Sequence, residues 1–108
     1  MKAGNFSSLQ SHEVKLETNY VIDGEATVLG GVKAPADINA TIDLNTLSSK
    51  NYPVGTGWSV DHRELHRVIA NSNYVAIEVS TPELDDVIRW QDKTNRSHGR
   101  IEAEHRKN

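Results

Sequence analysis

Histidine and glutamate side chains occur in this sequence in an order that suits a metal site. His12 stands five residues before Glu17, and His66 follows much later. Neutral imidazole is a good ligand for divalent transition metals, and a carboxylate adds charge that holds the ion. The sequence has no cysteine, which excludes thiolate ligands and disulfides. The spacing of His12 and Glu17 also fits an ordinary hairpin with surface side chains, so both interpretations stay open at this point.

Strand-favouring residues dominate the chain up to position 80. Asp23-Gly24 separates the apolar stretches 20–22 and 26–29 and predicts a hairpin, because glycine accepts a positive φ at a two-residue turn. Period-2 alternation predicts a strand over 38–45. Two further strands are expected over 65–70 and 74–80. With turn signals at near-regular intervals, this pattern indicates an all-β barrel or sandwich.

The other segments are predicted to be less regular. The stretch 46–58 is expected to be a long, turn-rich connection. A short helix is predicted over 80–88, where Ser80 or Thr81 can cap and Pro82 suits the first helical position. The residues after 92 have one large apolar side chain, Ile101, and His98 and His105 are expected to be solvated there.

Size and charge limit the class of protein. A chain of 108 residues is long enough for one domain with a modest core. The formal net charge of −3 gives no electrostatic reason to expect nucleic acid as a partner. No stretch approaches the roughly 18 apolar residues of a membrane span, and residues 1–10 lack the apolar core of a signal peptide. We therefore expect a cytoplasmic protein that binds neither nucleic acid nor membranes.

Three stretches in order resemble motifs of the cupin superfamily. AGNFSSLQSHEVKLETNYVIDGEA resembles the first cupin motif, in particular that of type II mannose-6-phosphate isomerases and GDP-mannose pyrophosphorylases. LHRVIANSNYVAIEVST resembles the second motif, in which a His-Arg strand is followed by a turn and a strand ending in Ile-Glu-Val. DDVIRWQDKTNRSHGR resembles the C-terminal ending of the same subgroup. Three motifs in the right order are more specific than any one of them.

The resemblance implies a small single-domain cupin, an all-β double-stranded β-helix with a jelly-roll-like barrel. The barrel would span residues 1–92. Within it, residues 32–60 have no counterpart in the family and are expected to form a strand and a long loop. A short C-terminal helical turn and a polar tail over 93–108 would follow.

The resemblance also implies a divalent transition metal, such as Zn, Mn, Fe or Ni, held by His12, Glu17 and His66. Val14 occupies the position at which the family has a second histidine. Three protein ligands with open coordination positions are sufficient for a catalytic metal. Further candidates for the site are Gln10, which shares a strand face with His12, and His62, four residues before His66.

The function that this resemblance implies is sugar-phosphate isomerisation. Glu17 and His66 would be the catalytic residues, because a carboxylate or imidazole can move a proton between adjacent carbons while a metal polarises the oxygens. Arg67 and Tyr20 are candidate contacts to a small sugar or sugar phosphate. The alternatives are a non-catalytic metal- or carbohydrate-binding cupin, and an accessory structural barrel without turnover.

The resemblance further bears on the oligomeric state. The chain begins almost at the first motif, so the strands that normally complete one edge of the barrel are not part of this sequence. An exposed sheet edge invites pairing with a second copy. The sequence therefore predicts a homodimer.

Overall fold

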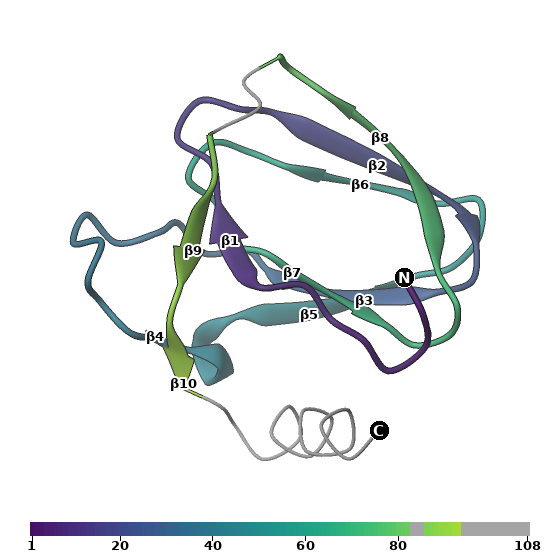
Figure 1. Cartoon of the computed structure of the whole chain (residues 1–108), viewed down its shortest axis with the longest axis horizontal. Coiled ribbons are helices and arrows are strands. Elements are labelled where there is room, and N and C mark those ends of the chain that lie inside the picture. The colour runs from purple at the N-terminus through teal and green to yellow at the C-terminus, as the bar shows by residue number, and fades with distance from the viewer. Residues whose placement is uncertain (83–85, 94–108) are drawn as a thin grey trace.

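Two three-stranded antiparallel sheets face each other in the computed structural model, which describes residues 1–82 and 86–93 (Figure 1). The first sheet has the order β6 (Gly57–Val60), β2 (Glu17–Asp23), β8 (Val75–Ser80). The second has the order β5 (Ser48–Tyr52), β3 (Ala26–Gly30), β7 (Arg67–Ala70). Two short pairs complete the fold: β1 (Leu9–Ser11) with β9 (Ile88–Trp90), and β4 (Ile42–Asp43) with β10 (Asp92–Lys93). The all-β prediction is confirmed.

The chain crosses from one sheet to the other after β2, β5, β6 and β7, and the crossings after β2 and β7 lie side by side. Because β2 pairs with β8 and β3 pairs with β7, a two-stranded antiparallel ribbon runs from the first sheet into the second. The predicted hairpin at Asp23-Gly24 is wrong, since β2 and β3 lie in different sheets. Gly24 has a φ of +74°, and a Cβ atom there would lie 1.9 Å from the carbonyl oxygen of Asn73 in the other crossing. This glycine is needed for the close approach of the two crossings.

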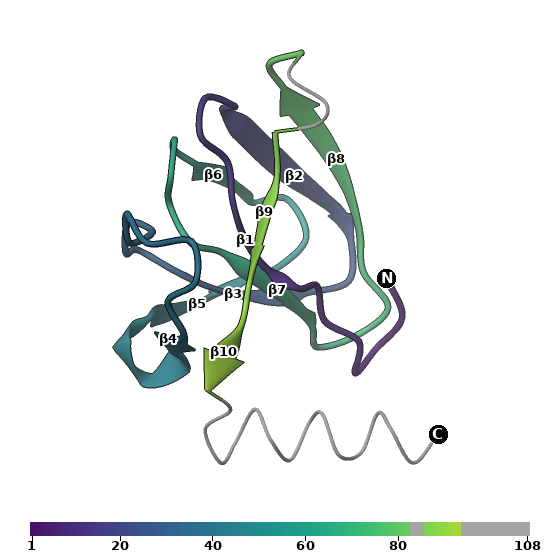
Figure 2. The same cartoon turned by 60° about the vertical axis from the view of Figure 1, so that its left-hand side comes forward.

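Strands occupy one end of the molecule where the sequence predicted a helix. Both views place β1 and β9 side by side at this end (Figure 1, Figure 2). The helix over 80–88 is wrong in its described parts, because Ser80 ends β8 and Ile88 begins β9; residues 83–85, and 94–108 of the predicted tail, lie outside the described residues. Pairing of β9 with β1 is favoured over helix formation here because it buries Trp90. The indole N–H of Trp90 donates to Oγ of Ser11 at 2.9 Å.

Over residues 1–82 and 86–93, the one helical element is a 3-10 turn, η1 (Leu44–Thr46). This described part of the chain includes no helix of the length and apolar character needed to cross a membrane.

The middle of the chain is more regular than predicted. The connection expected over 46–58 contains β5 and the start of β6. The sequence of β5, SSKNY, shows no apolar alternation, and the strand is held by pairing with β3 along its whole length. The strand predicted over 38–45 is reduced to β4, and Ile38 is 69% exposed. Neighbouring backbone, rather than side-chain pattern, decides the structure of this region.

Apolar side chains are buried in two clusters. The first lies between the sheets and comprises Val21, Ala26, Trp58, Val60, Ala70 and Tyr74. Strand alternation directs Leu29 and Ile69 to the opposite side of the β5-β3-β7 sheet, where they pack in a second cluster. Leu9, Leu44 and Trp90 belong to that second cluster. The large apolar side chains on the outer face of this sheet are therefore covered by the chain's own residues.

Candidate metal centre

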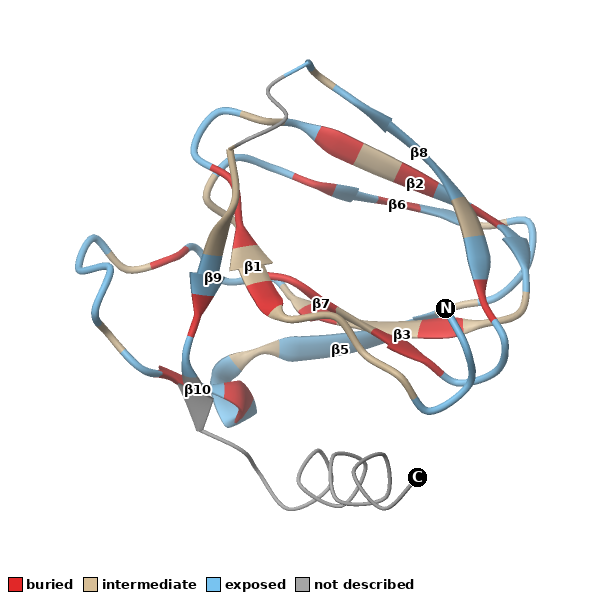
Figure 3. Cartoon of the chain, viewed as in Figure 1, coloured by how far each residue is buried: buried red, intermediate tan, exposed pale blue. Residues whose placement is uncertain are grey.

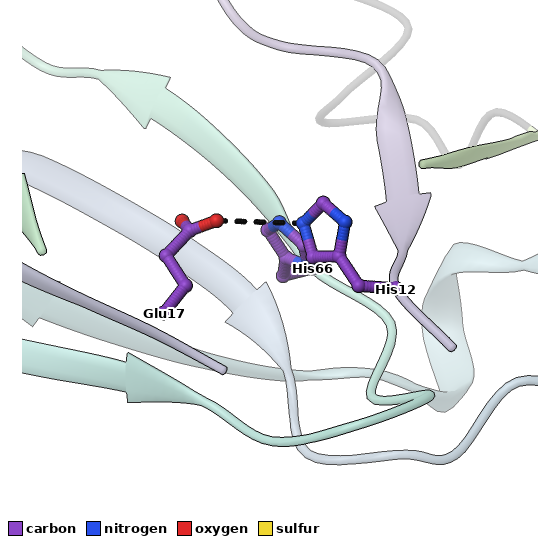
Figure 4. Close-up of side chains that lie close together, drawn as sticks. All are labelled: His12, Glu17 and His66. Atoms are coloured by element: carbon purple, nitrogen blue, oxygen red, sulfur yellow. Dashed lines mark ion pairs between the residues drawn. The ribbon is translucent and has the colours of Figure 1, made fainter. Parts of the chain in front are cut away.

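His12, Glu17 and His66 meet between the sheets, although His66 is far from the other two in the sequence. His12 follows β1, Glu17 begins β2 and His66 precedes β7. All three side chains are buried, and one ligand atom from each lies within 4.8 Å of the others. Nε2 of His12 is 3.4 Å from Oε1 of Glu17, and the two imidazole centroids are 5.2 Å apart (Figure 4). The structure thus brings together the three residues that the sequence analysis named as metal ligands.

The backbone of Asp86 orients the His12 ring. Nδ1 of His12 lies 2.5 Å from the Asp86 carbonyl oxygen. Because a carbonyl can only accept, Nδ1 carries a proton, and a neutral ring in this tautomer has its lone pair on Nε2. Nε2 is buried, and no described residue gives it a hydrogen bond. A metal-ligating histidine presents this arrangement, with one nitrogen held by a carbonyl and the other directed at the ion.

The side chain of Asp86 holds the loop between β1 and β2. Its carboxylate accepts hydrogen bonds from the backbone N–H groups of Val14, Glu13 and Lys15, at 2.8, 3.0 and 2.8 Å. These bonds, led by the one from Val14, favour the charged form and lower the pKa of Asp86. One residue therefore positions both His12 and the loop that follows it.

Glu17 has polar partners on the inner face of the first sheet. Asn19, two residues along β2, donates from Nδ2 to Oε2 of Glu17 at 2.9 Å. Nζ of Lys15 lies 3.8 Å from Oε1 of Glu17 and 3.3 Å from Oε2 of Glu78 on β8. The amide and the ammonium compensate for burying the Glu17 carboxylate. Besides its contact with Lys15, Oε1 of Glu17 is directed toward Nε2 of His12, 3.4 Å away.

His66 is fixed at the start of β7 by its pairing with Gln10. The backbone N–H and C=O groups of these two residues form reciprocal hydrogen bonds, both 2.9 Å long. Burial lowers the pKa of His66, and the charge of Glu17 offsets part of this effect. The imidazole is therefore neutral at neutral pH, which is the form that binds a metal.

The turn before His66 carries an unusual backbone conformation. Arg63 has a φ of +58°, in the left-handed region that non-glycine residues rarely adopt. Its backbone N–H donates to the carbonyl of His12 at 2.5 Å, and its guanidinium donates to the carbonyl of Ala34 at 2.9 Å. The strained residue thus links the turn that presents His66 to the backbone of His12.

A cavity of about 330 Å³ lies beside the three side chains. The aromatic side chains Trp58 and Tyr74 line it and are joined by a hydrogen bond of 3.3 Å from the indole to the phenol oxygen. The polar residues that line it besides the metal-ligand candidates include Gln10, Lys15, Asn19, Glu78 and Arg89. Gln10 is thus at the cavity, and its amide donates to Oγ of Ser8.

Three other predicted site residues do not reach this cavity. His62 lies on an exposed turn, where Nδ1 is 3.4 Å from the carboxylate of Asp61. Arg67 follows His66 on the strand and faces the other way; its Nε donates to the Ser7 carbonyl. Tyr20 lies between two inward-facing residues of β2 and is 52% exposed. Side-chain alternation along a strand explains the positions of Arg67 and Tyr20.

Position 14, where the family has its second histidine, faces solvent. Val14 is 56% exposed, and the loop turns Lys15 toward Glu17 instead. Lys15, Asn19 and Glu78 also line the cavity, and the motifs do not predict them. Lys15 and Asn19 flank Glu17 at a spacing of two, and this period-2 pattern could have identified them. The role of Asp86 depends on a contact 74 residues away in the sequence, which no local pattern reveals.

Comparison with known proteins supports the fold. No family model matches the sequence, and no curated protein matches it either. Among solved structures, the crystal structure of CapF with the inhibitor 3-isopropenyl-tropolone aligns with a TM-score of 0.56 and 15% identity. The alignment covers 83% of this chain and 26% of CapF, so the chain spans about a quarter of that protein's length. The likeness shows a cupin-like fold, and it does not bear on the mannose-6-phosphate isomerase subgroup.

Proposed function

We propose that this protein binds a divalent transition metal through His12, Glu17 and His66 and presents it to a small ligand in the cavity. The observation that carries this proposal is Nε2 of His12, which is buried, has no described hydrogen-bond partner and lies 3.4 Å from a carboxylate oxygen. Leaving a buried polar atom unsatisfied is costly, and a bound cation would satisfy it together with Glu17.

The three candidate ligands fit a metal that keeps open coordination positions. Two imidazoles and one carboxylate form the donor set of several zinc and non-haem iron sites. A metal bound here would polarise a carbonyl or hydroxyl oxygen of a ligand. The cavity of about 330 Å³ is at the lower end of the range for small-molecule sites, which suits a molecule of monosaccharide size.

Sugar-phosphate isomerisation of the mannose-6-phosphate isomerase type is our finer proposal. Lys15 and Arg89 line the cavity and offer cations to an anionic substrate. Glu17 or His66 would move the proton between adjacent carbons of the substrate. CapF was solved with a tropolone, a compound with neighbouring carbonyl and hydroxyl oxygens, and an α-hydroxy carbonyl sugar presents the same pair of donors.

A binding protein without turnover is the second candidate. Nζ of Lys15 lies within 4 Å of both Glu17 and Glu78. An ammonium at this distance competes with a substrate proton for the lone pairs of Oε1 of Glu17. This contact favours a cavity that holds a metal or carbohydrate and performs no proton transfer.

Metal titration of the purified chain tests the proposal. We expect one Co²⁺ or Zn²⁺ per chain by calorimetry, and visible absorption of the Co²⁺ form that changes when tropolone is added. His12→Ala and His66→Ala should weaken binding by at least about 100-fold. His62→Ala is the matched control, because His62 is exposed and outside the cavity. Stoichiometric binding that survives both site substitutions would contradict the proposed site.

A coupled assay separates the two candidate functions. The metal-loaded chain is incubated with mannose 6-phosphate, and formation of fructose 6-phosphate is followed. Turnover that disappears in Glu17→Gln supports the isomerase. If the protein binds metal and shows no turnover with manganese, zinc, cobalt or iron, the non-catalytic function is the better account.

A further inference from the structure

The outer face of the β6-β2-β8 sheet is exposed and apolar. β2 and β8 direct five large side chains away from the cavity, each between 47% and 60% exposed, and Leu16 before β2 adds a sixth at 43%. Figure 3 shows β8 exposed along most of its length. We call this surface the apolar face; its residues are Leu16, Tyr20, Ile22, Val75, Ile77 and Val79.

Among the outward positions of these three strands, Asp23 at the end of β2, opposite Val75, is the one charged side chain. The remaining outward residues are Thr18, Gly57 and Ser59, and the hydroxyls of Thr18 and Ser59 lie 2.9 Å apart in a hydrogen bond. An antiparallel sheet with one solvated face normally carries polar residues on that face. The pattern is reversed here, which marks an interaction surface.

The size of the apolar face matches a protein interface. Six large side chains, each about half exposed, leave on the order of 500 Å² of apolar surface, near the upper limit for a typical monomer. Protein interfaces are roughly 60% apolar, so this area corresponds to an interface of about 800 Å² on each partner. That is the standard size for a stable dimer.

We propose that a second copy of this chain covers the apolar face, with the two β6-β2-β8 sheets packed outer face to outer face about a two-fold axis. At its centre, around Ile77, the face carries no charge that would repel its own copy, and sheets pack in this way at a separation of about 10 Å. Asp23 borders the face with a negative charge. This charge opposes binding to an anionic lipid surface.

The geometry puts Ile77 at the centre of the interface. It lies in the middle of β8, directly across from Tyr20 on β2, whose ring lies over Gly57 of β6. A charge introduced at this position would be buried between two copies without a partner, which is strongly unfavourable.

Light scattering and sedimentation of the full chain test this proposal. At about 50 µM, well above the Kd of a standard interface, we expect the wild type at twice the chain mass of 12.0 kDa. Ile77→Glu and Val79→Glu should sediment as monomers. Ile38→Glu is the matched control, because Ile38 is 69% exposed and lies in the loop before β4, and it should remain dimeric.

Circular dichroism and Co²⁺ binding show whether a monomeric variant is still folded with its metal site intact. A monomeric variant that keeps its β spectrum and its metal affinity supports the proposal, since Ile77 points away from the cavity. If one variant fails to fold, the other decides the result. A monomeric wild type overturns the proposal, whether or not that monomer binds neutral vesicles or another protein. The proposal is also overturned if Ile77→Glu and Val79→Glu both remain dimeric. The measurement does not depend on whether the metal site functions.

Discussion

The two sheets differ in what covers their outer faces. Leu29 and Ile69, on the outer side of the β5-β3-β7 sheet, are buried under Leu9, Leu44 and Trp90. The corresponding side of the β6-β2-β8 sheet carries the apolar face, which no described residue buries. The β5-β3-β7 sheet obtains its second hydrophobic layer from its own chain. The β6-β2-β8 sheet has no such layer among the described residues, and under our proposal a second copy supplies it.

The largest expected effect on stability comes from comparing two variants, each with an aspartate on the outer face of one of the two sheets. Ile69→Asp should cost on the order of 4 kcal/mol of unfolding free energy, because Ile69 is 5% exposed and the carboxylate would have no partner. Ile77→Asp should cost only about 1 kcal/mol in the monomer. Urea unfolding at two protein concentrations measures both. Equal losses for the two variants would remove the distinction between the faces.

Metal binding should tie the two sheets together. Glu17 belongs to the first sheet, and His66 precedes a strand of the second. A ligand that binds only the folded chain at 100 times its Kd adds about 2.7 kcal/mol of stability. We expect this gain with Zn²⁺ in the wild type and in His62→Ala, and its loss in His12→Ala. An equal gain in all three chains would show that the metal acts elsewhere.

Asn19→Ala should weaken metal binding about tenfold, as is usual when a residue that orients a ligand is removed. Asn19 donates to Oε2 of Glu17 at 2.9 Å and lies on the inner face of the same strand that presents Tyr20 outward. Tyr20→Ala is the matched control, and should change oligomerisation without changing the affinity for the metal. Calorimetry with Co²⁺ separates the two faces of this strand. Loss of affinity in Tyr20→Ala alone would be the contrary result.

Asp86→Asn should lower Tm by a few degrees at neutral pH. The folded pKa of Asp86 lies below its usual 3.8, so its contribution to stability is present above that value and is lost as pH falls through the folded pKa. The difference between wild type and variant should therefore shrink in acid. Thermal unfolding across the acid range measures this difference in Tm. A difference that grows as pH falls would contradict the lowered pKa of Asp86.

Val14→His should have the smallest effect, changing metal affinity by no more than about twofold. The family pattern alone would predict a gain, because it restores a ligand. In this structure the side chain at 14 points to solvent, so a histidine there would have no access to the site. Calorimetry decides, and a tenfold gain would show that the loop can rearrange.

The order of the motifs predicted which three residues meet in the candidate metal centre. Long-range packing, which no local pattern reveals, determined the strand pairing around them. His12, Glu17 and His66 could be named from sequence because motif order implies where these residues meet. Arg67 and Tyr20 lie outside the cavity, because alternation along β7 and β2 directs their side chains away from it. The helix over 80–88 had good capping residues, and pairing of β9 with β1 outweighed them.

The sequence correctly indicates a tight turn at Asp23-Gly24, but it does not indicate which strands the turn joins. Asp23-Gly24 does form a tight change of direction with a positive φ. A hairpin and a crossing between sheets use the same local residues, however, and differ only in which strands pair. The polar strand β5 gives the opposite case, because its residues carry no strand pattern and its pairing with β3 defines it.

The tie between His12 and Asp86 also sets the order in which the protein can mature. The orienting carbonyl follows the histidine by 74 residues, and β1 pairs with a strand that is translated after every other part of both sheets. Contacts so distant in sequence close late and slowly. A nascent chain released from the ribosome short of residue 86 would contain all three candidate ligands and would lack the carbonyl that orients His12 and the carboxylate that holds the loop after it. Under our proposal, such a chain would bind the metal more weakly than the full one.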